Sequence, residues 1–148
     1  MSMVDHVLVP VDDSEPARKA FEYALDTFPE ATISVMHVID PSDIFHFADA
    51  DLESRDVQDF DEFQEQRKET VNRMLEDYVS KGEAQGVTVE SVKEVGQPER
   101  RILQFAETGD VDHIVIGSHG RSGVSRILLG SIAESVARRA PTPTTIIR

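Results

Sequence analysis

Residues Gly117–Ser131 read GSHGRSGVSRILLGS, and this stretch decides the interpretation of the rest of the chain. The short, largely apolar run Val111–Ile116 precedes it, and a segment with helical periodicity follows it. Glycines therefore stand where a strand ends and where a helix begins. Without a Cβ, Gly117 and Gly120 can adopt positive φ and let a ligand approach the main chain.

The segment after Gly130 predicts a helix that begins at Ser131. Ser131 and Glu134 have capping-box spacing, in which a hydroxyl accepts from an early amide and a carboxylate reaches back. The amides at such a helix start, together with the helix dipole, favour an anion. The alternative, that these glycines only shape turns and a helix cap, stays open for each glycine taken alone.

Strand and helix patterns alternate along the whole chain. The predicted strands are Val7–Val9, Thr32–Ile39, Val87–Val95, Val111–Ile116 and Thr144–Ile147. Four helices are predicted. The first begins at Ser14-Glu15-Pro16, and the second is a long helix that runs from Phe60 to Tyr78 and is ended by Gly82 and Gly86. The third follows Gly96-Gln97-Pro98, and the fourth begins at Ser131. This order is typical of an α/β protein, a parallel sheet with helices on both faces. Ligands of such sheets bind beyond the carboxyl ends of the strands, so Asp12 faces the glycine loop if the first and fourth strands are neighbours.

Length and composition restrict the class of protein. The 148 residues fit one domain, residues 1–148, and contain no cysteine for a disulfide or a thiolate metal site. The N-terminus lacks a basic region followed by a long apolar run, and no segment has the length of a membrane span. We expect a soluble, cytoplasmic protein without a membrane partner.

The charge balance is strongly acidic. A formal net charge of −13 argues against nucleic acid as a partner, because non-specific binders present a basic surface to phosphates. Lysine is scarce, being confined to Lys19, Lys68, Lys81 and Lys93. An acidic, lysine-poor surface suggests a salt-rich cytoplasm and an acidic proteome, since screening suppresses repulsion between carboxylates.

The segment Asp43–Glu65 is the most acidic part of the chain. Cation binding is one interpretation, but the glycine-containing calcium-loop pattern is missing. We expect a solvated, mobile crossover instead.

Common phosphate-binding signatures are absent, but one remains. The chain has no Gly-x-x-x-x-Gly-Lys-Ser/Thr run and no Gly-x-Gly-x-x-Gly run after a strand. The spacing Gly-x-x-Gly, nine residues, Gly-Ser resembles that of nucleotide-binding members of the universal stress protein family. Three further stretches are similar to landmarks of that family, in the same order along the chain: Pro10-Val11-Asp12-Asp13-Ser14, His37-Val38-Ile39-Asp40 and Gly96-Gln97-Pro98. The resemblance covers essentially the whole chain.

The resemblance implies a Rossmann-like fold and an adenine-nucleotide site. The expected fold is a single open five-stranded parallel sheet of strand order 3-2-1-4-5. Asp12 would accept hydrogen bonds from ribose or base, with Pro10 and Val11 lining that wall. Val38 would offer main-chain groups and an apolar face to adenine, and Ile116 would close the other side.

The same resemblance implies how the phosphates are held. Gly117 and Gly120 would let the loop fold against ribose and phosphates. The amides of Gly130, Ser131 and Ile132, with the Ser131 hydroxyl, would hold the phosphate chain. Arg121 is a candidate phosphate contact beside Gly120, whereas Arg126 is expected to be solvated. A magnesium ion held by Asp12 and Asp13 with the nucleotide is a further alternative.

Catalytic residues are not evident. His119 lies in the binding loop without a nucleophile and a partner carboxylate, and we expect it to stack on, or bond to, the loop or the ligand. His6, His37 and His113 open or lie within strands, where structural roles are expected rather than metal ligation.

Two functions follow from these observations. The first is a stress-response protein that binds ATP, or ADP or AMP, as a regulatory ligand and forms a homodimer through its last strand, which would otherwise be an unpaired edge. The second is a dimeric interaction module that uses no nucleotide. A weak ATP hydrolase is the third interpretation.

Overall fold

The computed structural model describes residues 4–41, 57–119 and 129–148, and residues 57–64 by their backbone alone. Strands and helices alternate in the predicted order. They are β1 (His6–Pro10), α1 (Glu15–Thr27), β2 (Thr32–Ile39), α3 (Val57–Ala84), β3 (Val89–Val95), α4 (Pro98–Thr108), β4 (His113–Gly117), α5 (Ser131–Arg139) and β5 (Thr144–Ile147).

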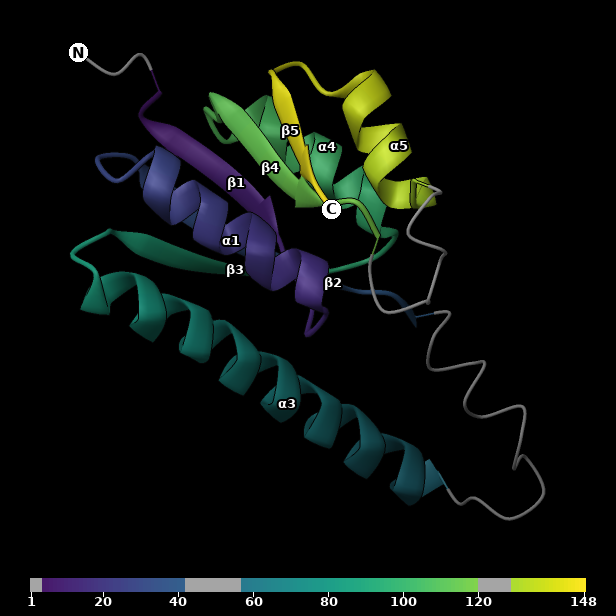
Figure 1. The fold of residues 1–148 in the computed structure, drawn as a ribbon. Helices are drawn as coiled ribbons and strands as arrows, with labels where there is room; N and C mark the ends of the chain where they lie inside the picture. The colour runs from purple at the N-terminus through teal and green to yellow at the C-terminus, as the bar shows by residue number, and fades with distance from the viewer. Residues whose placement is uncertain (1–3, 42–56, 120–128) are drawn as a thin grey trace.

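The five strands form one parallel sheet in the order β3-β2-β1-β4-β5, which confirms the predicted α/β fold and strand order. Helices α1 and α3 cover one face of the sheet, and α4 and α5 cover the other (Figure 1). Each strand therefore contributes alternate residues to two cores. Val7 and Val9 pack towards α1 and α3, and Leu8 between them packs towards α4 and α5.

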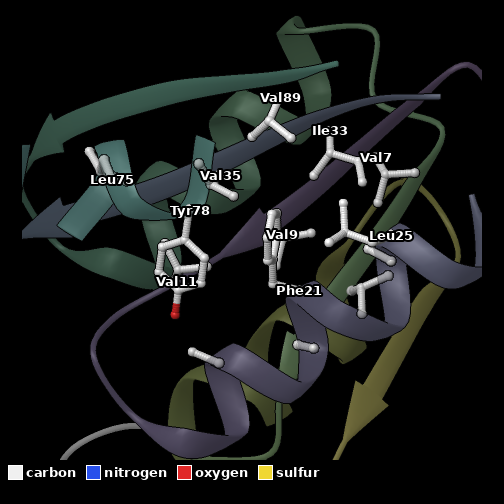
Figure 2. Packing of buried hydrophobic residues seen from close by; sticks show 14 of the residues in the cluster. Val7, Val9, Val11, Phe21, Leu25, Ile33, Val35, Leu75, Tyr78 and Val89 are labelled. Atoms are coloured by element: carbon white, nitrogen blue, oxygen red, sulfur yellow. The ribbon is translucent and has the colours of Figure 1, made fainter. Parts of the chain in front are cut away.

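The core beneath α1 and α3 is built from the apolar stripes of both helices. Phe21 of α1 is fully buried and lies edge-to-face against Tyr78 of α3, with ring centroids 5.0 Å apart (Figure 2). Val71 and Leu75 of α3 complete the stripe, as their spacing predicted.

Helix α1 begins as predicted from its polar start. Ser14 is the N-cap residue, its hydroxyl accepts from the Ala17 amide at 3.3 Å, and Pro16 lies in the first turn.

The prediction that Gly82 ends the long helix is wrong. Gly82 is buried within the last turn of α3, which ends at Ala84. A Cβ at Gly82 would lie 2.2 Å from Cγ2 of Val89, so the missing side chain gives β3 room to pack against the helix. Gly86, which has a φ of 78°, makes the turn after the helix.

The acidic segment is partly helical. Its last residues lie in α3, which begins at Val57, three residues before the predicted start of the helical stretch at Phe60. Residues 57–65 are therefore helical and are not part of the expected mobile crossover. Residues 43–56 lie outside the described part of the chain. Among the residues that the structure describes, no group of three or more histidines, aspartates or glutamates is placed to hold a metal ion.

Candidate functional site

The candidate site lies where β1 and β4 end side by side. These strands are neighbours in the sheet, as the sequence interpretation required. The chain leaves β1 towards α1 on one face, and after β4 it reaches α5 on the other face (Figure 1). Such a reversal of direction opens a crevice at the carboxyl edge of a parallel sheet.

The loop after β1 is held by contacts from several directions. The Val11 amide donates to the carbonyl of Met36 at 2.8 Å, and Nδ1 of His37 donates to the carbonyl of Val11 at 2.7 Å. The Tyr78 hydroxyl donates to the carbonyl of Asp12 at 2.9 Å. Oδ1 of Asp12 accepts from the Ser14 amide at 2.9 Å, which turns the chain into α1. Asp12 is therefore presented at this edge on an ordered backbone.

Pro10 and Val11 directly precede Asp12 and differ in burial. Pro10 is half-buried as the last residue of β1, and Val11 is buried in the core beneath α1 and α3. Val11 contributes mainly to that core, and Pro10 is the more exposed of the two.

Val38 and Ile116 lie on the same face of the sheet. Both pack with the core under α4 and α5, Ile116 buried and Val38 half-buried. The pairing of β1 with β2 ends at Pro10 and Met36, whereas β2 continues beside β3 to Ile39. Val38 therefore lies beyond the point where β1 stops, near the carboxyl edge of the sheet.

Gly117 does not have the positive φ that the sequence interpretation allowed. Its φ is not among the positive values that the structure gives to described glycines, which belong to Gly86 and Gly96. A Cβ at Gly117 would lie 2.8 Å from the carbonyl carbon and 2.9 Å from Cβ of Pro16. Gly117 therefore lets the first turn of α1 approach the end of β4, and so brings the two candidate loops together.

Ser118 connects the end of β4 with the start of α5. Its amide donates to the carbonyl of Ile147 at 2.7 Å, and its carbonyl accepts from the Gly130 amide at 2.7 Å. A Cβ at Gly130 would lie 2.9 Å from the Ser118 carbonyl oxygen, which accounts for a glycine at this position. Residues 120–128, which include Gly120, Arg121 and Arg126, lie outside the described residues.

The expected capping box at Ser131 is wrong, although the helix does begin there. The N-cap residue is Gly130, and in the described part of the chain no side chain caps α5. The Glu134 carboxylate pairs with Arg138 instead of reaching back, and the Glu134 amide donates to the carbonyl of Gly130 at 2.9 Å. Ser131 and Ile132 are exposed. Together these features leave the first turn of α5 accessible to an anion.

The histidines make local contacts. Nδ1 of His119 lies 3.1 Å from the Ser118 hydroxyl. His6 contacts the Ser34 hydroxyl at 2.7 Å, and His113 contacts the Thr145 hydroxyl at 2.7 Å. These contacts bear out the structural roles expected for His6 and His113, and His37 has such a role in holding the loop after β1.

Pro16, His37 and Tyr78 also shape this edge, although the sequence does not indicate this role. In the sequence, Pro16 indicates only a helix start, and Tyr78 only the end of the predicted helical stretch that begins at Phe60. A hydroxyl at a core position is the one signal that was available, because a buried tyrosine needs a hydrogen-bond partner. Its partner, the Asp12 carbonyl, comes within hydrogen-bond distance only in the folded structure.

Comparison with known proteins agrees with this architecture. The model of the universal stress protein family matches residues 3–148. Universal stress protein MJ0577 of Methanocaldococcus jannaschii is 31% identical over 156 residues, which cover 99% of this chain and 96% of that protein. Universal stress protein YxiE of Bacillus subtilis is 28% identical over 148 residues, which cover 99% of this chain and all of that protein.

Solved structures show the same fold. The structure of MJ0577 has a TM-score of 0.83 at 28% identity, covering 99% of this chain and 96% of that one. A universal stress protein family protein from Arabidopsis thaliana, with AMP bound, has a TM-score of 0.67 at 21% identity and covers 97% and 90% of the two chains. A universal stress protein in complex with cAMP has a TM-score of 0.70 at 22% identity and covers 99% of each chain.

The doubly wound sheet, with its reversal point between β1 and β4, defines an α/β protein of the class that receives ligands at the carboxyl edge of its strands. Within that class, the chain belongs to the universal stress protein family. Over residues 4–41, 57–119 and 129–148, none of the helices combines the length and apolarity needed to span a bilayer.

Proposed function

We propose that this protein binds ATP, or the related nucleotides ADP and AMP, as a regulatory ligand in the stress response. The observation that carries the proposal is the convergence of three segments at one edge of the sheet. The Asp12 loop, the end of β4 and the first turn of α5 are tied together through Pro16, Gly117, Ser118 and Gly130.

The adenosine end of the ligand is assigned to the β1 side of the crevice. Asp12 accepts hydrogen bonds from ribose or base beside Pro10 and Val11, and the apolar faces of Val38 and Ile116 contact the adenine. An ordered carboxylate next to apolar surface suits a nucleoside, which presents hydroxyl donors on the sugar and a flat base.

The phosphate end is assigned to the first turn of α5. The amides of Gly130, Ser131 and Ile132 and the Ser131 hydroxyl are the proposed donors, with Gly117, His119, Gly120 and Arg121 along the loop that leads to them. The Gly130 amide also donates to Ser118, so among the described residues Ser131 and Ile132 supply the donors least engaged. With ATP, Asp12 and Asp13 are the proposed ligands of a magnesium ion.

Two solved relatives support the class of ligand. They are the Arabidopsis thaliana protein with AMP bound and the universal stress protein in complex with cAMP. At about one fifth identity, these relatives show only that the fold is shared. The proposal that this chain binds an adenine nucleotide therefore rests on the residues of this chain. The family match over residues 3–148 also supports the expectation of one domain over residues 1–148.

The first test is to denature freshly purified protein, identify any released nucleotide, and titrate the nucleotide-free protein with ATP, ADP and AMP. Binding of at least one of them is expected, and binding of none, at both low and molar potassium chloride, would remove the proposal.

Adjacent carboxylates provide a matched pair of variants. Asp12→Asn keeps Oδ1 as the acceptor for the Ser14 amide but removes the charge, so AMP affinity is expected to fall about tenfold, as for a hydrogen bond to a charged group. In buffer without magnesium, where the proposed metal-ligand role of Asp13 is not in use, Asp13→Asn removes the same charge from the exposed neighbouring residue and is expected to leave AMP affinity within about twofold. Equal losses in both variants would place the ligand elsewhere.

The proposal includes a homodimer formed by β5, and the two sheet edges differ in a way that supports it. The edge strand β3 carries Glu90, Lys93 and Glu94, which oppose pairing with another strand. The other edge strand, β5, reads Thr-Thr-Ile-Ile and carries no charge. An uncharged edge strand is suited to pairing with a second copy of itself.

The orientation of β5 allows this pairing to be tested by one substitution. The carbonyls of Pro143 and Ile147 accept from β4, so the main-chain groups of Ile146 point away from β4 because orientation alternates along a strand. Ile146→Pro removes an outward amide and is expected to yield a monomer in light scattering, whereas Ile146→Val keeps the dimer. A monomeric wild type, or a dimeric Ile146→Pro protein, would contradict the β5 interface. A dimer that binds no nucleotide would favour the interaction module instead.

A further inference from the structure

The loop after β1 receives hydrogen bonds from two side chains that come from different elements. His37 of β2 donates to the Val11 carbonyl at 2.7 Å, and Tyr78 of α3 donates to the Asp12 carbonyl at 2.9 Å. The two acceptors are consecutive carbonyls at the point where the chain leaves the sheet. The second of these carbonyls belongs to Asp12, and the first to Val11 before it, so both hydrogen bonds hold the main chain that carries the Asp12 carboxylate.

The donor on α3 is the more informative of the two, because it reaches the loop from another layer of the structure. The Tyr78 side chain is buried among the core residues, and its ring lies against Phe21 while its oxygen points away from the strands, towards the loop after Val11 (Figure 2). Phe21 and the core position the ring, so the hydroxyl has a defined direction. Burial raises the pKa of Tyr78 to about 12, so the hydroxyl remains a donor at all physiological pH values.

The rest of the ring packing is independent of the hydroxyl. Edge-to-face contact with Phe21 and burial against the sheet would be the same for phenylalanine at this position. A tyrosine adds one function to this core position, a hydrogen bond to the loop that bears Asp12.

We infer that Tyr78 is a positioning residue for the nucleotide site, and that it couples helix α3 to nucleotide occupancy through the Asp12 main chain. This inference rests on the proposed function. A ligand that engages Asp12 binds most tightly when the Asp12 carbonyl is held by Tyr78. Because coupling between two sites is reciprocal, the bound ligand also stabilises the docking of α3 on the sheet.

The chain supplies its own control, because its other tyrosine is Tyr23. Tyr23 is 38% exposed on α1, whereas Tyr78 is 7% exposed. Tyr78→Phe and Tyr23→Phe each remove one hydroxyl and retain one ring. The comparison therefore isolates the hydroxyl that touches the loop.

The experiment has one readout without ligand and two with AMP. Without ligand, hydrogen exchange of the Ser14 amide, which donates to Asp12 Oδ1, is expected to accelerate in Tyr78→Phe and to stay at the wild-type rate in Tyr23→Phe. AMP affinity is expected to fall about three- to tenfold in Tyr78→Phe, the effect of one hydrogen bond, and to be unchanged in Tyr23→Phe. AMP is expected to slow exchange in residues 71–84 of α3 in the wild type, and to do so less in Tyr78→Phe.

The outcomes separate this inference from the proposed function. A merely structural role would lower the melting temperature of Tyr78→Phe and leave AMP affinity unchanged, which would overturn the inference while the proposed function stands. Wild-type protein that binds no adenine nucleotide would overturn both. Wild-type binding with unaltered exchange in α3 would overturn the coupling to that helix.

Discussion

Replacing Gly117 by alanine is expected to loosen the contact between α1 and the end of β4. The added Cβ would lie 2.8 Å, 2.9 Å and 3.0 Å from the carbonyl carbon, Cβ and carbonyl oxygen of Pro16. Carbon atoms in contact normally lie about 3.5–4.0 Å apart, so the shortest distance is too small by about 0.7 Å. These Pro16 atoms belong to the main chain or the ring and cannot rotate away. The first turn of α1 must move.

The size of the effect follows from overpacking. Inserting a methyl group against atoms that cannot turn aside costs about 1–3 kcal/mol of unfolding free energy. For a protein of this length, a loss of about 2 kcal/mol lowers the melting temperature by about 4–8 °C. The displaced turn directly follows Asp12 and Ser14, so AMP affinity is expected to fall as well.

Gly86→Ala is the control for an effect on stability alone. Gly86 has a φ of 78°, and no atom of the described residues lies within 4 Å of a Cβ placed there. Left-handed strain is expected to cost about 1–2 kcal/mol without moving any neighbour. Thermal melts and AMP titrations of both variants test the reasoning. A Gly117→Ala protein that melts and binds AMP like the wild type would refute it, as would a loss of affinity in Gly86→Ala.

Three further outcomes can be checked by thermal melts. Burial lowers the pKa of His113 below 6.5, so on acidification the unfolded chain binds a proton at His113 before the folded protein does. Stability is therefore expected to fall as the pH drops below 6.5, and His113→Gln should reduce this loss in a plot of melting temperature against pH. The pKa of Tyr78 is about 12 in the folded protein and 10.0 in the unfolded chain, so stability is expected to fall between pH 10 and 12, an effect that Tyr78→Phe should remove. With a net charge of −13, the melting temperature is expected to rise with potassium chloride concentration, and a constant value up to molar salt would argue against adaptation to a salt-rich cytoplasm.

The order and type of the elements could be predicted because local signals agreed with one another. The strands Thr32–Ile39 and Thr144–Ile147 have their predicted bounds, since both are runs rich in β-branched residues with prolines nearby. Helix α1 begins with the polar cap and the proline that its sequence indicated. For these elements, propensity and tertiary structure favour the same conformation.

The predictions that failed concern glycines whose role depends on a distant neighbour. Gly82 lies inside a helix because Val89 needs the space, and Gly130 rather than Ser131 is the N-cap because the Ser118 carbonyl lies against it. Neither contact leaves a local signal, because each partner comes from another element. The neighbouring positions of the β1 and β4 ends could be predicted from the topology of the sheet. The hydrogen bond from Tyr78 to the Asp12 carbonyl could not, because only the tertiary structure brings these two residues together.

The two unlike edges of the sheet also limit how large an assembly can grow. A chain with two adhesive edges could add copies at either end and extend into a fibre. Here the charges on Glu90, Lys93 and Glu94 protect one edge, so a second copy joined through β5 would present only protected β3 strands at both ends. Under the proposed β5 pairing, association would therefore end at two subunits.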